Sequence, residues 1–275
     1  MQILGVDFSG ARPDNNTWVA QGRLDGQGLI LESCGPVSRS QLSRLLEELP
    51  SEAVASLDFP FSVPQDFARF WMPEAKTMPD LWSAAAAMTL ADFISLRDTY
   101  VAQNGEPKRL GDTYHPESYS CLHKVNPNMV PMTFYGMKML AGLWPEGCEV
   151  PPLALQKMGR GVLLEAMPGA ALKAFKLPYK GYKNGARANL LRKEILQELP
   201  RRSSIQMPNL AEFCEQCMVS HDCLDSVVAA VIAALWSTNL DLFRHPERAG
   251  PSAPNSIAAL EGWLYAPVYI PSISG

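Results

Sequence analysis

Four aspartates stand where a fold commonly gathers its catalytic groups. Asp7 and Asp58 each close a short apolar segment that predicts a buried strand. Asp222 and Asp225 lie three residues apart at the start of a long apolar segment that predicts a helix. That spacing places both on one helix face, with Cβ atoms roughly 5–6 Å apart. Because an aspartate in an apolar strand is costly unless it is paired or metal-bound, these positions indicate a functional site.

The chemistry that such a set supports is metal-assisted hydrolysis. Converging carboxylates repel one another unless a cation lies among them, and their hard oxygen atoms suit Mg²⁺ or Mn²⁺. Two such ions about 3.5–4 Å apart activate a water molecule and stabilise the leaving oxygen in phosphodiester cleavage. The four aspartates therefore predict a two-metal site. Glu165 closes another strand-like segment and is a fifth candidate, as a ligand of a metal ion or of a water molecule.

Each acid also has a structural alternative. In the structural interpretation, Asp222 serves only as a helix N-cap, and Asp225 serves only as a favourable charge near the positive end of the helix dipole. Asp58 would set a turn before Phe-Pro-Phe, and Asp7 would support a phosphate-binding loop. Glu165 would cap the following helix or pair with a lysine. The four aspartates together are more specific than any one of them.

A basic stretch offers a second functional signal. Residues 157–202 contain eleven Lys and Arg against three Glu, which gives this segment a charge of about +8. Because the net charge of the whole chain is −4, all other residues together carry a charge of about −12. Within the segment Lys180, Lys183 and Arg187 flank two tyrosines in a glycine-bounded loop, a pattern that suits a nucleic-acid backbone. The stretch predicts binding of nucleic acid, DNA or RNA. A solvated surface with packed tyrosines is the alternative.

The cysteines and the apolar runs predict a cytoplasmic protein. Six cysteines without a secretory signal indicate reduced thiols, and no apolar run reaches the ~18 residues of a membrane-spanning helix. Cys214, Cys217, His221 and Cys223 have the residue types of a zinc site, but their last two spacings are short for one. Burial of these cysteines as small apolar side chains is favoured.

Sequence periodicity predicts the elements that must position the acids, in one domain spanning residues 1–275. Asp25-Gly26 between two strand-like runs predicts a hairpin, and residues 64–158, rich in Met, Pro and aromatics, predict a mostly helical insertion. The predicted strands are 2–8, 16–24, 28–34, 53–57 and 161–166, with 261–265 as a final strand or extended segment. The predicted helices are 38–49, 81–103, 132–143, 186–199 and 222–235. Their order is that of a mixed sheet with helices on its faces, an α/β fold.

Five short motifs carry a resemblance that extends from residue 5 to residue 265. They are G-V-D-F-S-G-A, D-F-P-F, E-A-M-P-G-A, H-D-x-x-D-S-V-V-A-A and E-G-W-L-Y, in this order. They resemble the domain-of-unknown-function family numbered 429, which is expected to have a ribonuclease-H-like fold related to Holliday-junction resolvases. The resemblance implies a five-stranded mixed sheet in the order 3-2-1-4-5 with helices on both faces, and the helical insertion 64–158 then falls between the fourth and fifth strands. It also implies a metal site at Asp7, Asp58, Asp222 and Asp225.

The sequence departs from the resolvase pattern at two points and leaves three functions open. Asp58 stands where resolvases commonly use Glu, and the long insertion follows it. A divalent-metal-dependent nuclease is the first interpretation. An actin-like ATP-dependent phosphotransferase is the second, because G-V-D-F-S-G-A resembles a phosphate loop, although no second D-x-G loop follows. A non-catalytic nucleic-acid-binding module is the third, and the presence of all four aspartates disfavours it.

Overall fold

The architecture is taken from a computed structural model of the whole chain. It describes residues 1–26, 28–144, 147–153, 159–248 and 255–268. The last residues of the predicted insertion, 154–158, and with them Lys157 of the basic stretch, lie outside the described residues. Within the described part, no helix is long and apolar enough to cross a membrane.

Five strands form one mixed sheet in the order β3-β2-β1-β4-β5. β1 pairs antiparallel with β2, which pairs antiparallel with β3. On its other side β1 pairs parallel with β4, and β4 pairs parallel with β5. This confirms the predicted strand order, including the Asp25-Gly26 hairpin. The strands are β1 (Gln2–Asp7), β2 (Thr17–Asp25), β3 (Gly28–Val37), β4 (Val54–Asp58) and β5 (Val162–Glu165).

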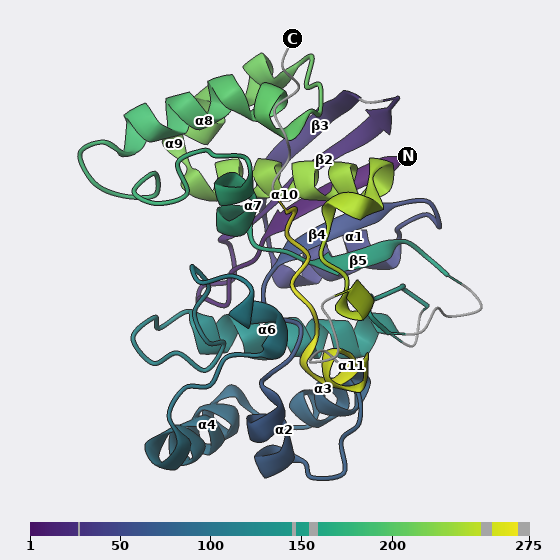
Figure 1. Cartoon of the computed structure of the whole chain (residues 1–275), viewed down its shortest axis with the longest axis vertical. Coiled ribbons are helices and arrows are strands. Elements are labelled where there is room, and N and C mark those ends of the chain that lie inside the picture. The colour runs from purple at the N-terminus through teal and green to yellow at the C-terminus, as the bar shows by residue number, and fades with distance from the viewer. Residues whose placement is uncertain (27, 145–146, 154–158, 249–254, 269–275) are drawn as a thin grey trace.

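Helix α10 (His221–Thr238) crosses one face of the sheet and is almost wholly buried against it (Figure 1). The close approach depends on Gly5 in β1. A Cβ atom at that position would come within 2.0 Å of the Ala230 backbone nitrogen and 2.1 Å of the Ser226 carbonyl oxygen. The absent side chain thus lets the helix backbone lie directly on β1. This contact fixes the start of α10 relative to the end of β1.

The remaining helices divide between the two faces. A core cluster on the α10 face includes residues of α7 and α8, and a second cluster packs α1, α3 and α6 against the opposite face. Helices α2, α3, α4 and α6 gather at one end of the molecule, and α8 and α9 lie at the other (Figure 1). The helices are α1 (Arg39–Glu47), α2 (Gln65–Trp71), α3 (Met78–Ala86), α4 (Leu90–Asn104), α5 (Leu110–Thr113), α6 (Met129–Leu143), α7 (Pro168–Ala174), α8 (Ala188–Ser203), α9 (Cys214–Val219) and α11 (Asn255–Glu261), with 3-10 turns η2 (Leu210–Phe213), η3 (Leu240–Leu242) and η4 (Pro246–Arg248).

Two of the predicted helices differ in the structure. The single helix expected over 81–103 is two helices, because Thr89 and Asp92 form a capping box that starts α4. Pro200 lies inside α8 rather than ending it. The segment 261–265, expected as a final strand or extended segment, is the end of α11 followed by extended chain, which reaches β5 through the hydrogen bond from the Tyr265 amide to the Glu165 carbonyl oxygen (2.9 Å).

Candidate active site

Asp7 and Asp58 lie side by side at the ends of two neighbouring parallel strands. They are register partners across the β1–β4 pair, so their backbones are about 4.8 Å apart. Side chains two residues apart share a face of a strand, and Gly5 faces α10. Asp7 therefore faces α10 as well, and its register partner Asp58 faces the same way.

The first turn of α10 supplies the other two aspartates. Ser220 is the N-cap, and its side chain accepts a hydrogen bond from the Cys223 amide (3.2 Å). Asp222 is therefore not the N-cap, which removes that structural alternative. Asp222 is half-buried, and Asp225 is fully buried.

The loop that precedes α8 contacts Asp225 through two of its side chains. The Tyr182 hydroxyl donates to Asp225 Oδ1 (2.7 Å), and Lys183 Nζ lies 2.7 Å from Asp225 Oδ2. Tyr182 is buried, whereas the Lys183 side chain is 48% exposed. Arg192 holds the loop by donating to the Tyr182 carbonyl oxygen (3.1 Å).

The electrostatics show that this cluster carries more negative charge than its surroundings balance. Burial, with repulsion from Asp225 and Asp58, raises the pKa of Asp7 well above its usual value. Burial raises the pKa of Asp58 to about 7, even though Lys183 opposes the shift. The nearby carboxylates, Asp225 foremost, raise the pKa of Lys183. The lysine ammonium thus partly neutralises four carboxyl groups.

The pKa of Asp222 shifts in the opposite direction to that of Asp7. Burial raises the pKa of Asp222, but the adjacent His221 and Asp7 outweigh this effect, and the net shift is downward. The His221 ring is 2.6 Å from the Asp222 carboxylate. The carboxyl groups of Asp7 and Asp222 therefore differ in how readily they bind a proton, and Asp7 binds it the more readily.

The donor set fits a divalent metal ion by its chemistry. All four groups are carboxylates, the ligands that Mg²⁺ and Mn²⁺ prefer, and the ammonium group of Lys183 already lies against one of them. Among the described residues, no three His, Cys, Asp or Glu side chains are already arranged around a metal-sized position. Binding of a metal ion would therefore require side chains of the cluster to move.

Glu165 belongs to a different network. It is the register neighbour of Leu57, not of Asp58, so it points to the opposite face of the sheet. There it forms a bidentate pair with Arg109, with Nη1 2.8 Å from Oε2, and accepts from the Phe61 amide (3.0 Å). Its charge contributes to the raised pKa of Asp58. This geometry favours a structural role, tying the insertion to the sheet.

The other predicted residues are only partly brought together. Lys180 lies over the Tyr179 ring (5.4 Å from Nζ to the centroid), and Arg187 is an exposed residue that precedes α8. Of the three predicted substrate-binding cations, Lys183 alone contacts an aspartate of the cluster in the described residues. The loop nevertheless holds all three within eight consecutive residues.

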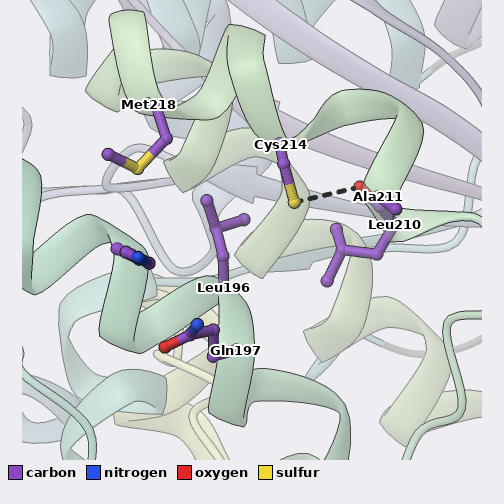
Figure 2. Close-up of a pocket in the computed structure, with 7 residues that line it drawn as sticks. Leu196, Gln197, Leu210, Ala211, Cys214 and Met218 are labelled. Carbon is purple, nitrogen blue, oxygen red and sulfur yellow. Dashed lines mark hydrogen bonds between the residues drawn. The ribbon is translucent and has the colours of Figure 1, made fainter.

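The zinc alternative does not match the geometry. The Cys214 thiol points to the Leu210 carbonyl oxygen (3.4 Å), in an apolar groove of about 430 Å³ beside α8 (Figure 2). The His221 ring is turned to Asp222. The four residues therefore do not converge.

Sequence reasoning missed Tyr182 as a hydrogen-bond partner of Asp225, His221 as a partner of Asp222, and Arg109 altogether. Tyr182 and His221 are adjacent in sequence to predicted site residues, which is a usable signal. Arg109 has no such sequence signal, because its partner Glu165 lies 56 residues away in the chain.

The sheet order and the strand-end carboxylates facing a helix define an α/β protein consistent with the ribonuclease-H-like fold. The model of a protein family of unknown function, DUF429, matches residues 5–248. The chain belongs to this family, as its motifs predicted. No curated protein matches the chain, and no solved structure matches it.

Proposed function

We propose that this chain is a divalent-metal-dependent nuclease that hydrolyses phosphodiester bonds in DNA or RNA. The observation that carries the proposal is the juxtaposition of Asp7 and Asp58 at adjoining strand ends, facing the α10 turn that bears Asp222 and Asp225. Mutual effects on their pKa values indicate that these carboxyl groups lie within electrostatic reach of one another.

The chain's own residues would divide the work as follows. Asp7, Asp58, Asp222 and Asp225 would hold Mg²⁺ or Mn²⁺, which when bound supplies Lewis-acid activation of water and neutralises charge on the leaving oxygen. Tyr182 fixes the orientation of Asp225 through its hydroxyl. Ser220 holds the first turn of α10 in place through its cap.

Lys183 connects the aspartates to the substrate. Its ammonium group is 2.7 Å from Asp225, while nearly half of its side chain is exposed. It therefore can bind a phosphate at the margin of the acidic cluster, where that phosphate would otherwise be repelled. Lys180 and Arg187, on the same loop, would guide the flanking backbone.

The test is a cleavage panel with single-stranded, duplex and branched DNA and RNA, in Mg²⁺, in Mn²⁺ and in chelator. We expect metal-dependent cleavage by the natural chain and its loss in Asp7→Asn. Asp25→Asn is the matched control, because Asp25 also ends a strand but is exposed on the surface. Equal cleavage by Asp7→Asn and the natural chain, or no cleavage of any substrate in either metal, would refute the proposal.

A further inference from the structure

Three cysteine thiols lie close together at the first turn of α10. Cys34 in β3 and Cys223 in α10 have sulfur atoms 2.9 Å apart, and Cys217 in α9 is 3.4 Å from Cys223. These pairs are separated by 189 and 6 positions in the chain. The distance of 2.9 Å between the Cys34 and Cys223 sulfur atoms exceeds the length of a disulfide bond, about 2.05 Å, by less than about 1 Å.

The backbones that carry these thiols are fixed. Gln216, next to Cys217, donates its side-chain amide to the Cys34 carbonyl oxygen (3.0 Å). The Ser226 hydroxyl donates to the Cys223 carbonyl oxygen (2.8 Å) and lies 3.4 Å from the Cys34 sulfur. The short sulfur–sulfur distance therefore follows from the packing of β3, α9 and α10, and does not depend on the rotamer of one side chain alone.

The three thiols differ in access to solvent. Cys217 and Cys223 are fully buried, whereas Cys34 is half-buried on the edge strand. A hydrogen bond from Cys223 lowers the pKa of Cys34 against the effect of burial, and Ser226 adds to this lowering. Cys34 is thus both the reachable thiol and the one whose thiolate, the reactive form, is favoured.

We propose that Cys34 and Cys223 form a reversible disulfide, with Cys34 as the peroxide-reactive thiol and Cys223 as the resolving thiol. This modification site is independent of the proposed nuclease activity.

The chemistry balances with a peroxide as the oxidant. The Cys34 thiolate attacks one peroxide oxygen, the O–O bond breaks, and Cys34 becomes a sulfenic acid while the other oxygen leaves as hydroxide and is protonated to water. The Cys223 sulfur then attacks the Cys34 sulfur, the S–O bond breaks, and the departing hydroxide takes the Cys223 thiol proton as a second water. Two thiols are oxidised and one peroxide is reduced. A dithiol reductant reverses the product.

The position of the bond gives it a structural consequence. Cys223 lies between Asp222 and Asp225 in sequence. A disulfide would tie the first turn of α10, with its aspartates, to the edge strand β3.

The experiment treats the reduced full-length chain with hydrogen peroxide, blocks the remaining thiols, and maps the cross-linked peptides by mass spectrometry. Cleavage on the N-terminal side of Asp222 separates Cys217 from Cys223, so the two possible partners of Cys34 are distinguished. We expect a Cys34–Cys223 peptide pair that has lost two hydrogens, and its disappearance after reduction.

Variants make the assignment specific. Cys34→Ser and Cys223→Ser should each abolish the cross-link, with thermal unfolding used to check that both fold. Cys214→Ser is the matched control, because Cys214 is also half-buried but its thiol points to Leu210 (Figure 2), and it should leave the cross-link unchanged. Free thiols throughout after peroxide, a Cys34 sulfenic acid that never resolves, or a disulfide that omits Cys34 would each overturn the proposal.

Discussion

At the scale of single residues, the candidate site is a place where the protein tolerates unfavourable electrostatics. Asp7 and Asp58 are brought together in the sheet, half-buried and facing further carboxylates. Lys183 compensates for only one of these charges directly, through Asp225. Such a cluster lowers folding stability and indicates that its arrangement serves a purpose other than stability.

The raised pKa of Asp58 predicts a pH-dependent gain in stability on its neutralisation. In the unfolded chain an aspartate has a pKa of about 3.9, whereas burial raises that of folded Asp58 to about 7. The folded state thus binds the proton more tightly, and the free energy of unfolding falls as pH rises across this window. In chelator, Asp58→Asn should be more stable than the natural chain by on the order of 2 kcal/mol at pH 8.

Urea unfolding at a series of pH values measures this difference. The advantage of Asp58→Asn should shrink toward pH 4, where the natural carboxyl group is protonated in the folded state and increasingly so in the unfolded chain. Asp25→Asn, at an exposed position, should show no such trend. A difference that stays constant from pH 4 to pH 8 would contradict the raised pKa.

At the scale of elements, the site depends on how closely α10 approaches β1. The helix backbone occupies the space that a side chain at position 5 would need. Any displacement of α10 from the sheet would move Asp222 and Asp225 away from the strand-end aspartates. The packing of one strand against one helix therefore sets the geometry of the acidic cluster.

Gly5→Ala should accordingly destabilise the protein strongly. The added methyl group would lie 2.0 Å from a backbone nitrogen that cannot move by a rotamer change, and overpacking of this kind costs about 3 kcal/mol or more. Gly35→Ala in β3 is the matched control, because a methyl group added there would meet nothing within 4 Å and its φ is not positive. Urea unfolding of both variants measures the difference, and equal stabilities would show that α10 moves freely.

The pair between Arg109 and Glu165 joins a second set of elements, the insertion and β5. Both side chains are buried, so removal of one leaves the other buried charge without this partner. A double-mutant cycle with Arg109→Met and Glu165→Gln should give a coupling energy of about 1–3 kcal/mol. The exposed pair Arg23–Glu32 (3.6 Å) is the control and should give less than about 1 kcal/mol. A coupling near zero for the buried pair would leave Glu165 free for another role.

At the scale of the whole molecule, charge is distributed unevenly along the chain. The basic stretch of residues 157–202 contrasts with an otherwise acidic protein. The structure places its Lys183 against the aspartates, while Lys180 and Arg187 occupy the same loop. Binding of a polyanion should therefore be directed to the side of the molecule that holds the acidic cluster.

Salt dependence of nucleic-acid binding tests this directly. Replacing Lys180 and Arg187 by Ala should reduce the slope of log affinity against log salt by about 2, because two fewer phosphate contacts release two fewer counterions. Fluorescence anisotropy with a labelled oligonucleotide measures the slope. The control pair, Arg23→Ala with Arg44→Ala, removes the same charge elsewhere and should leave the slope unchanged. Equal slopes in the two double variants would show that the loop does not contact the backbone.

The amino-acid sequence by itself determined the strands, the hairpin, helix α10 and the aspartates at their ends, because alternation and helical spacing are local properties of the chain. It also located Glu165 at the end of a strand. A strand-end position does not say which face of the sheet a side chain takes, since that depends on which neighbours cover each face. Only the tertiary structure decided that Glu165 faces Arg109, that Tyr182 and Lys183 bind Asp225, and that Cys34 meets Cys223. Each of these pairs joins residues far apart in the chain, and such contacts arise from packing, which local patterns do not encode.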